Sequence, residues 1–259
     1  MKITVLCENT SRRANIEAEH GLSLYIETEH ANILFDMGQT DLFCRNANIL
    51  GVDLSRVDFA VLSHGHYDHG GGFEAFRQSN PNAPVFVSPH AFGQFYSTKF
   101  IGLSPSVAAD PHVRPATGTI TLAKGVTLWA DCQIEADEMV GKGLFSMENG
   151  TLSPDDFRHE IYLLVQEKDK TTLFCGCSHR GVANIQAFFK PDVLVGGFHL
   201  KNLSPGEHKN YFDTLAHRLV AENTHYYTCH CTGEAAFSAL QESMGDRLNA
   251  LSCGDTLIL

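Results

Sequence analysis

The sequence predicts an α/β fold, of the α+β kind, in which two mixed β-sheets pack face to face with helices outside. Strand patterns open the chain, a helix follows, strand patterns return, and strands and helices alternate in the last third. Because each sheet or helix must bury its apolar face against another element, this order favours a layered sandwich. With 259 residues, 43% of them hydrophobic, the chain can bury one large core, so we expect a single domain over residues 1–259.

The first third predicts short strands that lead into a histidine-rich loop. Apolar runs or alternating apolar residues predict strands over residues 2–7, 22–27, 32–35 and 59–63. The segment from His64 to Gly72 ends in three glycines and cannot continue the last of these strands, so we expect a loop. A short helix over residues 73–78 and a strand over residues 84–88 are predicted next.

The rest of the chain predicts one irregular excursion and then regular elements. Residues 93–115 contain three prolines and little periodicity, which is typical of a segment that covers a site. Ser204 with Pro205 and Glu207 forms a capping-box pattern, which predicts a helix start ahead of an apolar face. Further strands are predicted over residues 120–122, 126–130, 161–166, 171–175, 193–195, 226–228 and 257–259, and a further helix runs through Phe237 and Leu240.

Composition excludes several classes of protein. Nineteen basic and thirty acidic residues give a net charge of −11, which disfavours a broad nucleic-acid or membrane surface. No stretch reaches the roughly 18 apolar residues of a spanning helix, and the N-terminus turns polar early, so a cytoplasmic protein is expected. The eight cysteines are scattered and are expected to be reduced. The expected partner is a small-molecule substrate, with no nucleic acid and no membrane, and homo-oligomer formation is left open.

One short segment carries the ligands of a metal site. His64, His66, Asp68 and His69 place three imidazoles and a carboxylate within six residues, directly after an apolar strand. In a tight loop they can converge as two groups, with His64 and His66 on one cation and the other two on a second. Zinc, as one or two ions, suits the imidazole-rich set best, with manganese or iron as alternatives.

This segment is the H-x-H-x-D-H motif, and the chain resembles the metallo-β-lactamase superfamily over nearly its whole length. Residues 33–38 are similar to the family's earlier strand that ends in Asp-x-Gly, where the aspartate, Asp36 here, supports the site without being a principal ligand. The resemblance implies an αββα sandwich, two sheets with helices outside, and a metal site at one edge of the sheets.

Three later segments are similar to a narrower branch, the dihydropterin ribofuranosyl-aminobenzene phosphate synthase-like hydrolases. They are residues 176–185, 196–200 and 229–233. The superfamily places a bridging aspartate where this chain has Cys177. A thiolate binds zinc but is less suited than a carboxylate to bridging hard ions, so Cys177 is either a ligand or a small buried side chain.

Two histidines compete for the third position on the first cation, His159 before the predicted hairpin and His179 after it. We prefer His179, because its Cys-Ser-His-x-Gly context matches the branch. The expected sets are His64, His66 and His179 on one cation and Asp68, His69 and His230 on the other. His199 is expected to support the site or face the substrate, and Cys229 and Cys231 to be buried thiols. Surface positions are expected for His20, His30, His208, His217 and His225.

The sequence thus predicts a metal-dependent hydrolase in which a metal-activated water attacks a small phosphoester or phosphodiester. Asp68 is the expected catalytic residue, since it is placed to orient the nucleophile or take its proton. Arg180 beside the site is expected to pair with phosphate oxygens. A thioester or lactone hydrolase is the nearest alternative. A di-iron redox protein is the alternative from another class, and a binding module without catalysis is disfavoured by the intact motif.

Overall fold

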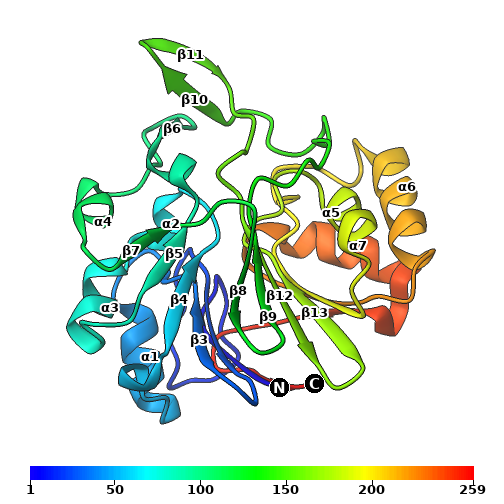
Figure 1. Cartoon of the computed structure of the whole chain (residues 1–259). Coiled ribbons are helices and arrows are strands. Elements are labelled where there is room, and N and C mark those ends of the chain that lie inside the picture. The colour runs from blue at the N-terminus through cyan, green and yellow to red at the C-terminus, as the bar shows by residue number, and fades with distance from the viewer.

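Two seven-stranded β-sheets pack face to face in the computed structural model, which describes all 259 residues (Figure 1). The first sheet has the order β17 (Thr256–Ile258), β1 (Lys2–Cys7), β2 (Ser23–Glu27), β3 (Asn32–Phe35), β4 (Phe59–Leu62), β5 (Val85–Val87) and β7 (Val113–Pro115). The second has the order β16 (Leu248–Ala250), β15 (His225–Thr228), β14 (Val193–Gly196), β13 (Lys170–Phe174), β12 (Tyr162–Glu167), β9 (Val126–Trp129) and β8 (Thr119–Ala123). Both sheets are mixed, because each joins a parallel half to an antiparallel half.

The layer between the sheets is built by the alternation of side chains along each strand. In β3, Ile33 and Phe35 face this central layer, whereas Leu34 between them faces the outer helices. Phe35 meets Phe174 of the opposite sheet, with ring centroids 6.0 Å apart. Each such ring is fully buried, which stabilises the fold by roughly 1.5–3 kcal/mol per side chain.

Helices cover the outer face of each sheet and complete the four layers (Figure 1). The first sheet packs against α1 (Leu42–Leu50), α3 (Phe73–Ser79) and α4 (Pro105–Ala109), and the second against α5 (Val182–Phe189), α6 (Lys209–Val220) and α7 (Glu234–Met244). The predicted αββα sandwich is therefore confirmed. None of these helices combines the length and the apolar character that crossing a bilayer requires.

A small third sheet projects from the sandwich at the top of Figure 1. It consists of β6 (Gln94–Tyr96), β10 (Phe145–Glu148) and β11 (Thr151–Pro154). The excursion predicted over residues 93–115 is thus partly regular, because it supplies β6, α4 and β7. Short 3-10 helices occur at Leu54–Arg56, Pro89–Phe92, His230–Thr232 and Gly245–Arg247.

Two sequence-based boundaries are wrong. The expected loop after β4 contains a single helical turn, α2 (Tyr67–Gly70). The helix expected from Ser204 begins only at Lys209. Ser204 does accept the backbone N–H of His208 at 3.0 Å, but the φ of −117° at His208 leaves the helical region and separates this turn from α6.

Candidate metal centre

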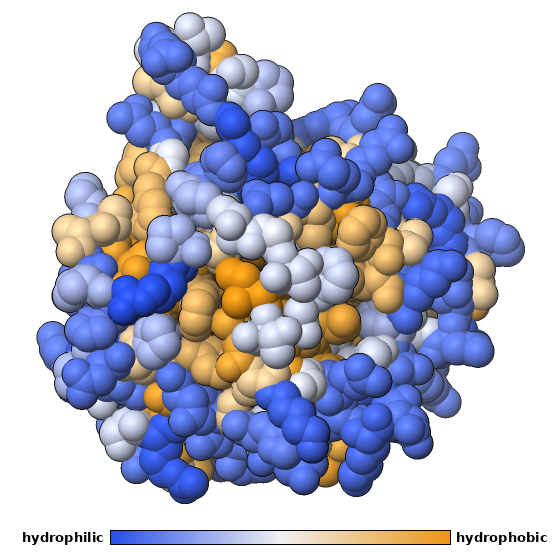
Figure 2. Space-filling model, in the orientation of Figure 1, coloured by the Kyte–Doolittle hydropathy of each residue, from blue (hydrophilic) through white to orange (hydrophobic).

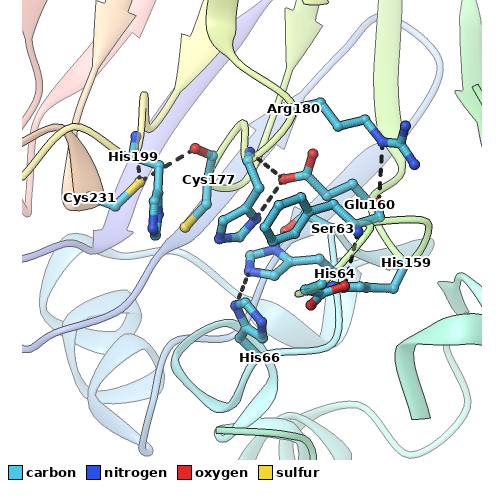
Figure 3. Close-up of polar contacts among 12 residues, drawn as sticks. Ser63, His64, His66, His159, Glu160, Cys177, Arg180, His199 and Cys231 are labelled. Atoms are coloured by element: carbon cyan, nitrogen blue, oxygen red, sulfur yellow. Dashed lines mark hydrogen bonds and ion pairs between the residues drawn. The ribbon is translucent and has the colours of Figure 1, made fainter. Parts of the chain in front are cut away.

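The polar side chains that the motifs singled out follow the carboxyl ends of parallel strands. In the first sheet, Asp36 follows β3 and His64 comes shortly after β4. In the second, Cys177, His199 and His230 follow the adjacent parallel strands β13, β14 and β15. Ligands of α/β proteins bind at this edge of a sheet. The packing of the two sheets brings both sets of strand ends together, as the close-up in Figure 3 shows.

His64, His66 and His179 form a buried group whose ligand atoms all lie within 4.8 Å of one another. Nε2 of His64 lies 3.1 Å from Nδ1 of His66 (Figure 3). Nε2 of His66 and Nε2 of His179 are buried without any hydrogen-bond partner. Since buried ring nitrogens are normally paired, this group fits a cation that accepts their lone pairs.

Two chains of hydrogen bonds orient these imidazoles. Ser63 donates its hydroxyl proton to Asp36 at 2.7 Å, so its oxygen accepts Nδ1–H of His64 at 2.8 Å, which leaves Nε2 of His64 with a free lone pair. Glu160 accepts both the backbone N–H and Nδ1–H of His179, each at 2.8 Å. Carboxylates that hold the far nitrogen of an imidazole in this way are typical of metal-binding histidines. Sequence reasoning did not identify Ser63 or Glu160.

A second group lies beside the first. His69 donates Nδ1–H to Asp36 at 2.6 Å, and His230 donates Nδ1–H to Asn9 at 2.9 Å, so both rings direct Nε2 to the same place. The two Nε2 atoms are 3.2 Å apart, and Nε2 of His230 is 3.4 Å from a carboxylate oxygen of Asp68. The structure therefore brings together Asp68, His69 and His230, the residues expected on the second cation.

His20 belongs to this second group, although the sequence suggested a surface position. Its Nε2 lies 3.1 Å from the Asp68 carboxylate, and the two residues form a possible ligand group with His230. The neighbouring Gly21 explains the approach, because a Cβ there would lie 2.7 Å from the backbone oxygen of Asp68. The sequence offered one indication of this role, the His20-Gly21 pair just before a strand. The residue that His20 contacts, Asp68, is far away in sequence.

The electrostatics of the first group keep its three imidazoles neutral, and those of the second group keep the Asp68 carboxylate charged. Burial, followed by repulsion among neighbouring imidazoles, lowers the pKa of His64, His66 and His179 well below the ordinary value. Burial opposes ionisation of Asp68, but the hydrogen bond from His20 and the neighbouring rings of His230 and His69 outweigh it and hold the pKa of Asp68 well below its usual range. Neutral imidazoles and an ionised carboxylate are the forms that bind a divalent cation.

The family model described as the metallo-beta-lactamase superfamily matches residues 17–178, more than half of the chain. The chain belongs to this superfamily. The match includes the complete H-x-H-x-D-H segment and ends at Ser178, just before His179.

Individual relatives and solved structures match nearly the whole chain. A relative from Methanocaldococcus jannaschii, named 7,8-dihydropterin-6-methyl-4-(beta-D-ribofuranosyl)-aminobenzene-5'-phosphate synthase, is 25% identical over 268 residues, which cover 92% of this chain and 89% of the relative. The crystal structure of Tm1679, described as a metal-dependent hydrolase of the beta-lactamase superfamily, has a TM-score of 0.86 and 28% identity, covering 100% and 99% of the two chains. Zn²⁺-bound PqqB from Methylobacterium extorquens shares the fold, with a TM-score of 0.60 and 12% identity over the full length of both chains.

Hydrogen bonding distinguishes His159 from His179, although His159 also forms a possible ligand group with His66 and Asp155. Nδ1 of His159 accepts the backbone N–H of Gly65 at 3.0 Å, so its Nε2–H donates to Asp155 at 3.0 Å. Both ring nitrogens of His159 are therefore in use, whereas Nε2 of His179 is free. This geometry favours His179 as the third member of the first group.

We predict that His179→Ala lowers the metal content far more than His159→Ala does, because only His179 offers a lone pair to the site. Elemental analysis of the two variants, purified side by side, provides the measurement. A larger loss of metal from the His159 variant would reverse the assignment.

Arg180 does not reach into the cluster. Its Nη1 donates to the backbone oxygen of Ile134 at 2.7 Å and its Nε to that of Phe157 at 3.3 Å. Figure 3 shows the guanidinium directed away from the histidines. The expected contact with phosphate oxygens is therefore not supported, because backbone carbonyls already hold these donors.

Cys177 and His199 do lie at the site. The sulfur of Cys177 is 3.2 Å from Nε2 of His69, and the thiol is only 3% exposed. The ring of His199 is 4.4 Å from that of His179 and is half-buried. Cys229 and Cys231 are buried thiols, as expected.

Proposed function

We propose that the chain is a metal-dependent hydrolase, most readily loaded with zinc, that cleaves a small phosphoester or phosphodiester. The observation that carries this proposal is the pair of adjacent buried groups, in which the imidazoles direct free ring nitrogens inward. His64, His66 and His179 would hold one cation, and Asp68, His69 and His230 the other. When bound, such ions polarise the scissile group and make water nucleophilic near neutral pH.

Asp68 is the residue suited to moving the proton. Its carboxylate is ionised and only 8% exposed, so it can accept a proton from a water molecule held beside it. His20, 3.1 Å from the same carboxylate oxygen, has a side chain that is 35% exposed. The Asp68–His20 pair therefore connects the buried centre to solvent and can pass the proton outward.

Local positive charge supports an anionic substrate. Nζ of Lys201 lies 3.4 Å from Nε2 of His20, and Nζ of Lys99 lies 5.1 Å from the ring centroid of Tyr67, within the motif. These lysines flank the centre in a chain whose net charge is −11. Lys201 thus takes over the role that the sequence suggested for Arg180. The relative whose name includes a 5'-phosphate supports the same class of substrate.

The proposal predicts hydrolysis of an activated phosphodiester, bis(p-nitrophenyl) phosphate, that a chelator abolishes and added zinc or manganese restores. The reason is that two adjacent cations can stabilise both the attacking and the leaving oxygen. Release of nitrophenol by the parent protein, the chelated protein and the reloaded protein provides the measurement.

A thioester and a lactone serve as parallel substrates in the same assay. Cleavage of either of these without any phosphoester cleavage would contradict the phosphate assignment and leave the metallo-hydrolase intact. Transfer of the released group to an added amine or alcohol, without net hydrolysis, would contradict the hydrolase itself.

A further inference from the structure

A third group of potential ligands, Cys177, His199 and Cys231, lies beside the two described above. Their ligand atoms are all within 4.8 Å of one another. They follow the carboxyl ends of the three adjacent parallel strands β13, β14 and β15 (Figure 3). The two thiols are 3% and 1% exposed, respectively, so neither sulfur is a surface group.

The contacts of Cys231 hold its sulfur toward the other two residues. The backbone N–H of His199 donates to this sulfur at 3.2 Å, and the thiol itself lies 3.6 Å from the backbone oxygen of Cys177. Gly197 leaves the space that the sulfur fills, because a Cβ at Gly197 would lie 2.4 Å from it. The residue that follows β14 therefore leaves room for the Cys231 thiol.

His199 contributes a ring nitrogen that lacks a partner. Its Nδ1 is buried and makes no hydrogen bond. The backbone of His199 has a φ of 51°, which lies in the left-handed region that is uncommon for residues other than glycine. Such a conformation is strained and persists where the surroundings enforce it, which is common at ligand sites.

The chemistry of this group differs from that of its neighbours. Two sulfurs and one imidazole are the ligands that zinc and other thiophilic divalent ions prefer, whereas the first two groups offer nitrogen and carboxylate oxygen. Cys177 connects the groups, because its sulfur also lies 3.2 Å from Nε2 of His69. His199 is the one half-buried member of the group, since both thiols are buried.

We propose that Cys177, His199 and Cys231 form a third cation site, specific for zinc or a similar thiophilic ion, next to the two-cation centre. The bound ion would tie together the ends of three strands and fix Cys177 against His69. Each ion would displace the protons of two thiols. The proposal does not depend on which substrate the protein hydrolyses.

The test uses Co²⁺ as a probe, because thiolate ligation of cobalt produces a near-ultraviolet charge-transfer band. Full-length protein is purified with reductant and without air, stripped with a chelator and titrated with Co²⁺. We expect Cys231→Ser and His199→Asn each to bind about one ion fewer per chain than the parent and to lose most of this band. Asparagine is chosen because it tolerates the left-handed backbone of His199. Cys44→Ser, at a half-buried thiol of α1, is the matched control and should behave like the parent.

Three outcomes would overturn the third site. One is unchanged cobalt stoichiometry in both variants. Another is loss of the band at unchanged stoichiometry, because the thiols would then be ligands of the two-cation centre. The last is a Cys177–Cys231 disulfide in the protein prepared without air, detected by peptide mapping. None of these results bears on phosphodiester hydrolysis, which is measured separately.

Discussion

Replacement of His66 by alanine is expected to remove most of the bound metal and to lower the hydrolytic activity by more than about 100-fold. The reason is that loss of a residue that only hydrogen-bonds to a metal ligand already lowers metal affinity or activity by up to about 100-fold. His66 stands 3.1 Å from His64 and belongs to the group that includes His179. The same result is expected for His69→Ala in the second group. Neither side chain belongs to the hydrophobic core, which lies between the two sheets and between each sheet and its helices. Both variants should therefore stay folded.

Metal analysis, activity and circular dichroism on the same preparations check this expectation. His217→Ala, at an exposed position of α6, is the control and should match the parent protein in all three measurements. Full metal content in both the His66 and the His69 variant would show that the centre is assigned to the wrong residues.

Asp68→Asn is expected to reduce turnover by about 10²–10⁴-fold, the range of a lost general acid or base. An amide neither accepts a proton from water nor carries the charge that balances a cation. The substituted side chain keeps its shape, so the Michaelis constant should change much less than turnover.

Steady-state kinetics with excess zinc separate these two effects. Asp213→Asn removes an equally charged side chain from the exposed surface of α6 and should leave both constants unchanged. Turnover of Asp68→Asn within a few-fold of the parent would exclude Asp68 from proton transfer.

Local pattern was enough to predict most of the sandwich. Strands such as β1 and β3 are short apolar runs bounded by polar residues, and their predicted limits match the structure. Helices α1 and α5 were not predicted. The α5 segment, Val182–Phe189, is apolar almost throughout and lacks the polar positions that reveal a helical period. The start of α6 was placed too early because the capping pattern at Ser204 serves an isolated turn.

The candidate site divides in the same way. The ligands that stand close together in sequence, from His64 to His69, were predictable because their spacing alone implies convergence. The residues that orient them were not. Asn9 contacts His230 across 221 positions, and Glu160 contacts His179 across 19. The Asn9–His230 contact depends on how the two sheets meet, which no local pattern contains. The other two contacts, Glu160 with His179 and His20 with Asp68, join segments of a single sheet, and they depend on how its strands are arranged.

The position of Asp36 has a consequence for how the centre can change. Its carboxylate accepts Nδ1–H of His69 directly. It also accepts the hydroxyl proton of Ser63, whose oxygen in turn accepts Nδ1–H of His64. The electron-donating strength of one imidazole in each cation group is therefore influenced by the same carboxylate oxygen, Oδ2 of Asp36. A substitution of Asp36 would weaken imidazole ligands in both groups. The affinity for one cation could therefore not be changed at this residue without changing the affinity for the other.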